Sequence, residues 1–181
     1  MKFISVLKFF LVIIIPAMIF LLAMNAAGLD NSFYTKKFSE YGVDKNIPKA
    51  GSIHQKVMDF IKGNSDGLPA EFNEREKQHL LDVRKLIGIG TVLMYILIIL
   101  FILLLVLSAL TLKASTYVNK FVGKVLLFGG LLTLGLALLI FALISADFYS
   151  SFESFHKMLF DYGTYSFDSS REIIVNLYPE Q

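Results

Sequence analysis

Two histidines, His79 and His156, stand in settings that suit proton-transfer chemistry. His79 follows a helix start at Asn73-Glu74-Arg75-Glu76, and Asp82 lies three residues after it, where it can share a helix face. His156 lies beside a helical stripe of apolar residues that follows Asp147. A neutral imidazole accepts a proton near physiological pH, whereas an imidazolium donates one or stabilises an oxyanion. Such a pair is suited to general acid–base catalysis.

A metal site is the main chemical alternative for these residues. Glu76 and His79 form an E-x-x-H pair on one helix face, as in di-iron bundles, and His156 could join them. Glu76 is already explained, however, as the N3 residue of a capping box that starts at Asn73. A di-metal site also needs more carboxylates than one such pair provides. The sequence therefore favours a site with no metal and no other cofactor.

Composition excludes several other classes of function. Cys is absent, which rules out thiolate catalysis, disulfides and Cys-type zinc sites. Serine-nucleophile chemistry is not favoured, because the serines near the histidines are scattered. The net charge is only +2 and no run of Lys or Arg occurs, so we expect no nucleic-acid partner.

Three long apolar blocks position these residues. Residues 9–28, 86–112 and 125–146 contain no charged side chain, and each block is long enough to cross a ~30 Å hydrocarbon core. For 9–28 a cleaved signal peptide is the alternative, but the run is longer than the ~7–15 residues usual for signals. We therefore predict a single all-α membrane domain with three transmembrane helices. Glycines in the last block and just before it suit close helix packing: Gly123, Gly129, Gly130 and Gly135.

The distribution of Lys and Arg predicts the orientation of the spans. The short link between the second and third blocks holds Lys113, Lys120 and Lys124 and no acid, which is typical of a cytoplasmic loop. Segment 29–85 mixes acids and bases in nearly equal numbers, and the tail 147–181 is mainly acidic. We thus expect a multi-pass protein of the cytoplasmic membrane, with both polar segments on the extracytoplasmic face.

The polar segments contain short helices of their own. Ser52 and Gln55 suggest a capping box, followed by an apolar stripe that Gly63 ends. This helix either lies in the membrane interface or covers the top of the bundle. His54, on the same helix, is interpreted as a solvated surface residue. We expect an extracytoplasmic cap of short interfacial helices around the site.

A single long helix is expected from Asn73 to Leu112, because no proline interrupts it and Asn73 and Glu76 form a capping box. At ~1.5 Å per residue this helix is longer than the membrane is thick, so its first turns project beyond the outer surface. His79 and His156 then reach the same depth on independent helices. We expect their imidazoles to lie within roughly 10 Å of one another, close enough to act on one reacting centre.

The motifs around both histidines resemble those of a known family. The matching residues are Phe72-Asn73-Glu74-Arg75-Glu76, His79, Asp82-Val83, Asp147-Phe148, Phe152, Phe155-His156, Phe160 and Pro179-Glu180, with Ser32-Phe33-Tyr34 and Glu40-Tyr41-Gly42 nearer the N-terminus. Together they resemble the lipoprotein intramolecular transacylases and their wider family of small integral membrane proteins. The resemblance covers nearly the whole chain.

The resemblance implies an enzyme of the acyltransferase class. In that family the sn-2 acyl chain of a diacylglyceryl-modified lipoprotein moves to the α-amino group of its N-terminal Cys, which gives the lyso-form. By resemblance His79 and His156 are the catalytic pair. We expect His79 to act as the base and His156 as the oxyanion donor and acid, and the reverse assignment stays open. Asp82, three residues after His79, is expected to orient its ring, and Arg75, Glu76 and Asp147 are further supporting residues. The implied partners are a lipoprotein substrate and membrane lipid.

Two departures from the family pattern stand out. The family normally has a fourth span after the PE motif, whereas this sequence ends at Gln181, so either the sequence is truncated or it is a shorter relative. The family also tends to place Trp where this chain has Tyr165. Two alternatives stay open at this point: a non-enzymatic membrane scaffold or subunit, and a metal-dependent membrane lipid hydrolase.

Overall fold

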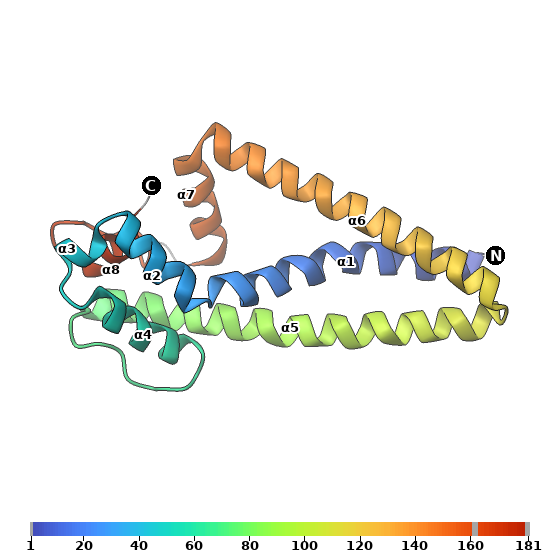
Figure 1. Ribbon diagram of the computed structural model, residues 1–181, viewed down its shortest axis with the longest axis horizontal. Coiled ribbons are helices and arrows are strands. Elements are labelled where there is room, and N and C mark those ends of the chain that lie inside the picture. The colour runs from blue at the N-terminus through green and yellow to red at the C-terminus, as the bar shows by residue number, and fades with distance from the viewer. Residues whose placement is uncertain (1, 161–162, 180–181) are drawn as a thin grey trace. The chain divides into compact units, whose positions relative to one another are not determined.

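The computed structural model describes residues 2–160 and 163–179, and its regular elements in these ranges are α-helices. They are α1 (Lys2–Gly28), α2 (Asn31–Glu40), α3 (Val43–Asn46), α4 (Ala50–Ile61), α5 (Glu74–Leu112), α6 (Ser115–Ala146), α7 (Phe148–Leu159) and α8 (Ile173–Leu177) (Figure 1). Among them α1, α5 and α6 are long and apolar enough to cross a membrane. The prediction of an all-α protein with three membrane-spanning helices is confirmed.

The long helices extend further than the apolar blocks that predicted them. Helix α5 runs without interruption from Glu74 to Leu112, as its proline-free sequence requires. Helix α6 already begins at Ser115, so Lys120 and Lys124 lie in its first turns rather than in a loop. The turn before it is short, and Lys113 adopts a positive φ of 59° there.

Contacts divide the described chain into two compact units. Unit 1 comprises residues 2–24 and 90–152. Its core joins the start of α1 to the start of α6 through buried side chains: Leu7, Leu11, Ile15, Phe121 and Val125. Most other apolar side chains of α5 and α6 are exposed, for example Leu110 and Phe141, each at 68%. Such a surface suits helices surrounded by lipid.

One glycine of α6 sits where α1 approaches most closely within unit 1. A Cβ placed on Gly129 would lie 2.3 Å from Ile15 Cδ1 and 3.0 Å from its Cβ, so rotating the Ile15 side chain would not make room. By contrast, Gly123, Gly130 and Gly135 have nothing within 4 Å of such an atom. The expected close packing by glycine therefore occurs at Gly129.

We expect Gly129→Ala to lower the free energy of unfolding by about 1–3 kcal/mol, because an added methyl overpacks the contact with Ile15. Gly130→Ala is the matched control on the neighbouring residue, and it should leave stability unchanged or raise it by up to about 1 kcal/mol. Thermal unfolding in detergent micelles measures both. Equal unfolding temperatures of the two variants would contradict the close approach of Ile15 to Gly129.

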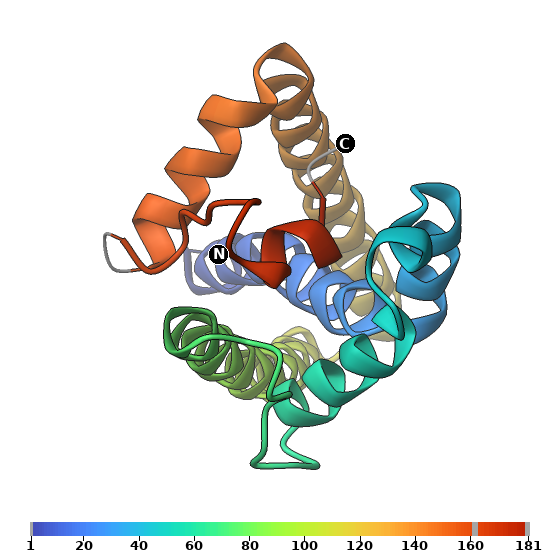
Figure 2. The same ribbon diagram turned by 90° about the vertical axis from the view of Figure 1, so that its left-hand side faces the viewer.

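Unit 2 comprises residues 25–89 and the described residues from 153 to 179. Its core is formed by α2, α3, α4, the first turns of α5 and α8, which pack together (Figure 2). The apolar stripe of α4 is buried in this core: Ile53, Val57, Phe60 and Ile61 are at most 9% exposed. Of the two expectations for α4, the structure supports a helix that covers other protein elements, because its apolar face is already occupied.

The start of α4 was predicted wrongly. The helix begins at Ala50 after Lys49, whose φ is 67°, so Ser52 lies inside the helix and does not cap it. Gln55 instead hydrogen-bonds Asn31 and Asp59. The predicted end is confirmed, since Gly63 follows the last turn with a φ of +78°, which a residue without Cβ adopts easily.

His54 is not a solvated residue. It is 1% exposed, and its Nδ1 lies 2.9 Å from the Tyr178 hydroxyl. The rings of Tyr34, Phe38 and Tyr178 surround it. Burial lowers its pKa to about 4, with Lys62 contributing. The prediction failed because the covering residues come from α2 and from the C-terminal segment, distant in sequence.

Candidate active site

A reciprocal capping box starts α5, as predicted. The Asn73 side-chain oxygen accepts hydrogen bonds from the Arg75 and Glu76 amides at 2.9 and 3.0 Å, and Glu76 Oε2 accepts one from the Asn73 amide at 2.7 Å. The second Glu76 oxygen accepts the Ile174 amide of α8 at 2.8 Å. One buried carboxylate therefore caps two helices. Both of its oxygens face backbone amides, which accounts for Glu76 without a metal role.

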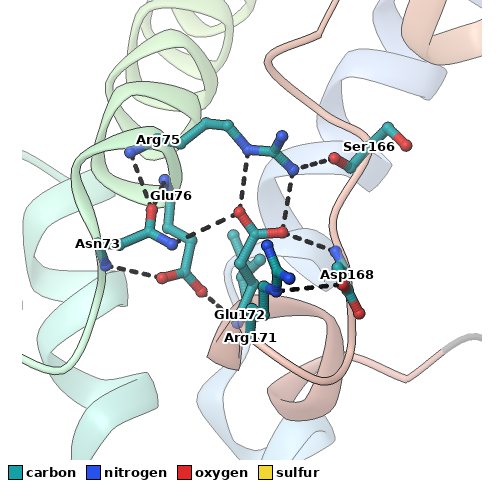
Figure 3. Close-up of polar contacts among 8 residues, drawn as sticks. Asn73, Arg75, Glu76, Ser166, Asp168, Arg171 and Glu172 are labelled. Carbon is teal, nitrogen blue, oxygen red and sulfur yellow. Dashed lines mark hydrogen bonds and ion pairs between the residues drawn. The ribbon is translucent and has the colours of Figure 1, made fainter.

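The same turn of α5 holds the C-terminal segment through Glu172 (Figure 3). The Glu172 carboxylate accepts Arg75 Nε and Nη2 at 2.9 Å each, and it also accepts the Asp168 amide at 2.6 Å. Asn73 Nδ2 contacts it at 3.4 Å. Arg75 additionally donates to the Ser166 carbonyl oxygen. These bonds fix the path of residues 166–172 beside the first turns of α5.

The two predicted histidines meet within unit 2. The ring centroids of His79 on α5 and His156 on α7 lie 6.3 Å apart with an interplanar angle of 27°. The expected proximity of the two imidazoles is confirmed. The start of each helix is fixed by a local cap. The capping box fixes where α5 begins, and Asp147 caps α7 by accepting a hydrogen bond from the Ser150 amide at 3.0 Å.

Aromatic side chains surround the histidine pair. Phe160 contacts both rings, at centroid distances of 4.9 Å from His79 and 5.6 Å from His156. Phe167 meets His79 edge-on at 5.4 Å, and Tyr165 lies 5.3 Å from His156. Tyr165, which stands where the family tends to have Trp, is therefore a neighbour of His156. We call Phe160, Tyr165 and Phe167 the aromatic cluster.

Burial sets the protonation state of His79. This residue is 8% exposed, and it lies among the charged first turns of α5, before the apolar part of the helix. Burial lowers its pKa to about 4, with a further lowering from the charge of His156 and an opposing effect from Asp82. The ring is therefore neutral near pH 7 and able to accept a proton. Its Nδ1 is buried and has no hydrogen-bond partner among the described residues.

The supporting residues occupy varied positions. Asp82 shares the His79 face, and its Oδ1 accepts hydrogen bonds from Gln78 and Lys85, both at 3.3 Å. No hydrogen bond between the described residues Asp82 and His79 is seen. Asp147 serves as the cap of α7. Arg75 and Glu76 act at the start of α5, as described above. Glu180, the second residue of the PE motif, lies outside the described residues.

Sequence reasoning missed the segment that completes the site. Glu172, Tyr165 and Phe167 all lie in the loop and first turn before α8, where no periodicity indicates structure. One signal was available: Glu172 precedes the apolar run Ile173-Ile174-Val175, the place of a capping residue at a helix start. Its partner Arg75 lies 97 residues earlier, and no local pattern predicts that contact.

Three helices long and apolar enough to cross a membrane define an integral membrane protein, and the histidine pair of unit 2 is a site suited to acid–base chemistry. The family described as "Lipoprotein intramolecular transacylase Lit" matches residues 9–181. The chain therefore belongs to this family of acyltransferases, as its motifs predicted.

Solved structures support the same fold. A structure of the membrane integral lipoprotein intramolecular transacylase Lit from Bacillus cereus is 20% identical, with a TM-score of 0.81, over 98% of this chain and 82% of that chain. Two further structures of that protein carry a histidine substitution, to Arg in one and to Ala in the other. Each is 21% identical with a TM-score of 0.78, over 99% of this chain and 80% or 81% of theirs. A comparison with curated proteins found no significant match.

Proposed function

We propose that this protein transfers the sn-2 acyl chain of a diacylglyceryl-modified lipoprotein to the α-amino group of its N-terminal Cys, with His79 and His156 as the acid–base pair. The observation that carries this proposal is the 6.3 Å separation of the two rings, which come from different helices into one aromatic environment. Family membership supports the reaction, and the geometry supports the choice of residues. The partners of the reaction are the lipoprotein and the lipid of the membrane.

In the first step His79 takes a proton from the amine of the substrate. An α-ammonium has a reference pKa of ~7.7–8.0, so it must lose this proton before it attacks the ester carbonyl. The lowered pKa of His79 keeps the ring free to accept, although it also makes the ring a weaker base than the ordinary imidazole we expected from sequence. The negative charge that develops on the carbonyl oxygen raises the proton affinity of the ring during attack.

In the second step the tetrahedral intermediate collapses. His156 stabilises the oxyanion and then protonates the departing glyceryl oxygen, while the C–O ester bond breaks and the new C–N amide bond remains. The substrate nitrogen loses two protons in all. The one that His79 removes from the ammonium before attack passes to solvent, and the one that leaves the nitrogen of the tetrahedral intermediate balances the proton that His156 gives to the glyceryl oxygen. Amine and ester belong to one molecule, so the enzyme mainly holds a near-attack geometry, which is worth ~7–11 kcal/mol in favourable cases.

For the location of the site we propose the extracytoplasmic face of the cytoplasmic membrane. An acid-free stretch of unit 1 holds Lys113 in the turn and Lys120 and Lys124 in the first turns of α6, and it supports a cytoplasmic position for that turn. Residues at the other ends of α5 and α6 then lie outside. The lipid anchor of a lipoprotein is reached from the same face.

Cysteine labelling tests this orientation, because the natural chain has no Cys. We expect Ser65→Cys to react with an impermeant thiol reagent in intact cells, and Ser115→Cys to react only after the membrane is opened. Ser115 is the first residue of α6, whereas Ser65 lies in the loop before α5. The reverse labelling pattern would contradict an extracytoplasmic site.

The pH dependence of transfer should follow His79. Protonation removes the base, so kcat/KM falls as the pH drops through the folded pKa, which burial lowers to about 4. We therefore expect the acid limb to lie nearer pH 4 than the ordinary histidine value of ~6.5. An acid limb of the kcat/KM profile at the ordinary histidine pKa would contradict the role of the buried His79 as the base.

Stability must be followed over the same range as a control. His79 and His54 have folded pKa values of about 4, below the unfolded value. Between the two values the unfolded chain binds more protons than the folded one. Their contribution to stability is thus complete above pH ~6.5 and is lost as the pH falls towards 4. Rates are compared only where circular dichroism shows the protein to be folded.

Mass spectrometry of one lipoprotein from cells with and without this protein tests the proposed function. With the protein, fragmentation should locate an acyl chain on the Cys amine and a single chain on the glyceryl group. Total mass does not change in an intramolecular transfer, so fragmentation is the informative step. Identical fragments from both strains would contradict the proposal.

A further inference from the structure

We infer that Glu172 is a positioning residue for the histidine pair and acts on the His79 ring through Arg75 and Phe167. Its carboxylate is 7% exposed, and it is outside the set of residues that the sequence motifs indicated. The contribution of Glu172 to catalysis rests on the proposed function. The effect of Glu172 on the position of the His79 ring is independent of that function, because contacts alone imply it.

The contacts form a continuous path from Glu172 to His79. Glu172 holds the guanidinium of Arg75 with two bonds of 2.9 Å (Figure 3). The guanidinium carbon of Arg75 lies over the Phe167 ring, 5.1 Å from its centroid. Phe167 in turn meets His79 edge-on at 5.4 Å. The charge-assisted pair of Glu172 and Arg75 therefore holds the Phe167 ring in place, and this ring packs against His79.

Glu172 also fixes the backbone that carries Phe167. Its Oε2 accepts the Asp168 amide at 2.6 Å, and its Arg75 partner donates to the Ser166 carbonyl oxygen. The residues immediately before and after Phe167 are thus both tied to this pair. A shift of the carboxylate would displace Phe167 through its backbone and through the guanidinium that covers it.

The orientation of His79 depends on packing more than is usual for a catalytic histidine. Its buried Nδ1 has no hydrogen-bond partner among the described residues, and Asp82 is occupied by Gln78 and Lys85. Among the described residues, no hydrogen bond to Nδ1 fixes the angle of the ring. The contacts with Phe160 and Phe167 do so instead, which makes the support of Phe167 consequential for proton transfer.

Kinetics of Glu172→Gln, Arg75→Gln and the double variant test this inference. The loss of the ion pair should lower kcat by up to ~10²-fold with little change in KM, the scale expected from a displacement of about 1 Å. The double variant should be no slower than the slower single variant, because both disrupt one path. Exposed neighbours give matched controls: Glu74→Gln and Arg171→Gln, whose side chains are 91% and 84% exposed, should keep the wild-type kcat.

Ring signals of the histidines give a readout that a merely structural role would not move. The chain has three histidines, so selective labelling yields a small set of imidazole NMR signals that His→Gln variants assign. Glu172→Gln should shift the His79 signals and leave those of His54 unchanged, whereas both controls should leave the His79 signals in place. A lower melting temperature with unchanged His79 signals and unchanged kcat would overturn the inference.

A second variant covers the case in which Glu172→Gln does not fold. Phe167→Leu leaves the ion pair intact and removes the ring at the other end of the path. It should shift the His79 signals and lower kcat, and unchanged His79 signals would overturn the inference. If the wild-type protein transfers no acyl chain, the proposed function fails, and the NMR comparison still decides whether Glu172 positions the ring.

Discussion

Replacement of His79 by alanine should abolish measurable acyl transfer, because the substrate amine then stays protonated in a poorly hydrated site. General acid–base groups commonly contribute ~10²–10⁴-fold to a rate, so a loss at least of this size is expected. Purified variants with a diacylglyceryl lipopeptide measure the effect directly. Because His79 is 8% exposed among aromatic rings, its removal leaves a cavity, and folding of each variant is checked by thermal unfolding.

His79→Asn separates proton transfer from packing and hydrogen bonding. Asparagine keeps polar contacts but has no pKa in the useful range, so this variant should be as inactive as the alanine variant. Asp82→Asn is the milder comparison, because Asp82 binds Gln78 and Lys85 and influences His79 only by its charge. Transfer by His79→Asn at the wild-type rate would contradict its role as the base.

Replacement of His156 by alanine should slow transfer by ~10²–10³-fold, the usual cost of removing one oxyanion donor. The effect should fall mainly on kcat, since the interaction exists only in the transition state. The variant that lacks both histidines should be little slower than the slower single variant, because the two groups act on one proton path. Simple addition of the two losses would instead indicate independent roles.

A second comparison separates a chemical role of His156 from an effect of its side chain on packing. Tyr165→Phe removes a hydroxyl from the neighbour of His156 and keeps the ring that packs against it. If His156 acts chemically, Tyr165→Phe should stay far more active than His156→Ala. Equal losses in the two variants would point to disturbed packing of the aromatic cluster.

The parts of this site that the sequence predicted share one property: they depend on local rules. Asn73 and Glu76 satisfy the free amides of their own helix start, so spacing alone predicts the capping box. The absence of proline between Asn73 and Leu112 predicts one long helix. The membrane restricts the depth of each polar helix end, so the sequence alone predicts a common level for His79 and His156.

The parts that sequence reasoning missed depend on contacts between distant residues. His54 reads as a surface residue on its own helix, but it is buried by rings of α2 and by Tyr178, 124 residues later. Glu172 reads as an ordinary tail residue, and its ion pair with Arg75 links it to a helix start 97 residues earlier. Lys49, which precedes α4, adopts a left-handed backbone conformation that non-glycine residues rarely adopt. The Ser52 capping pattern therefore predicted a helix start that is too late.

The most direct test of the proposed function uses the purified protein in proteoliposomes with a synthetic diacylglyceryl-Cys lipopeptide. Fragment spectra are recorded for the wild type, His79→Ala and Glu74→Gln, the last as a surface control near the same helix start. We predict an N-acyl lyso-form product with the wild type and Glu74→Gln, and none with His79→Ala. An N-acylated product formed equally by His79→Ala, or no product with the folded wild type, would contradict the proposal.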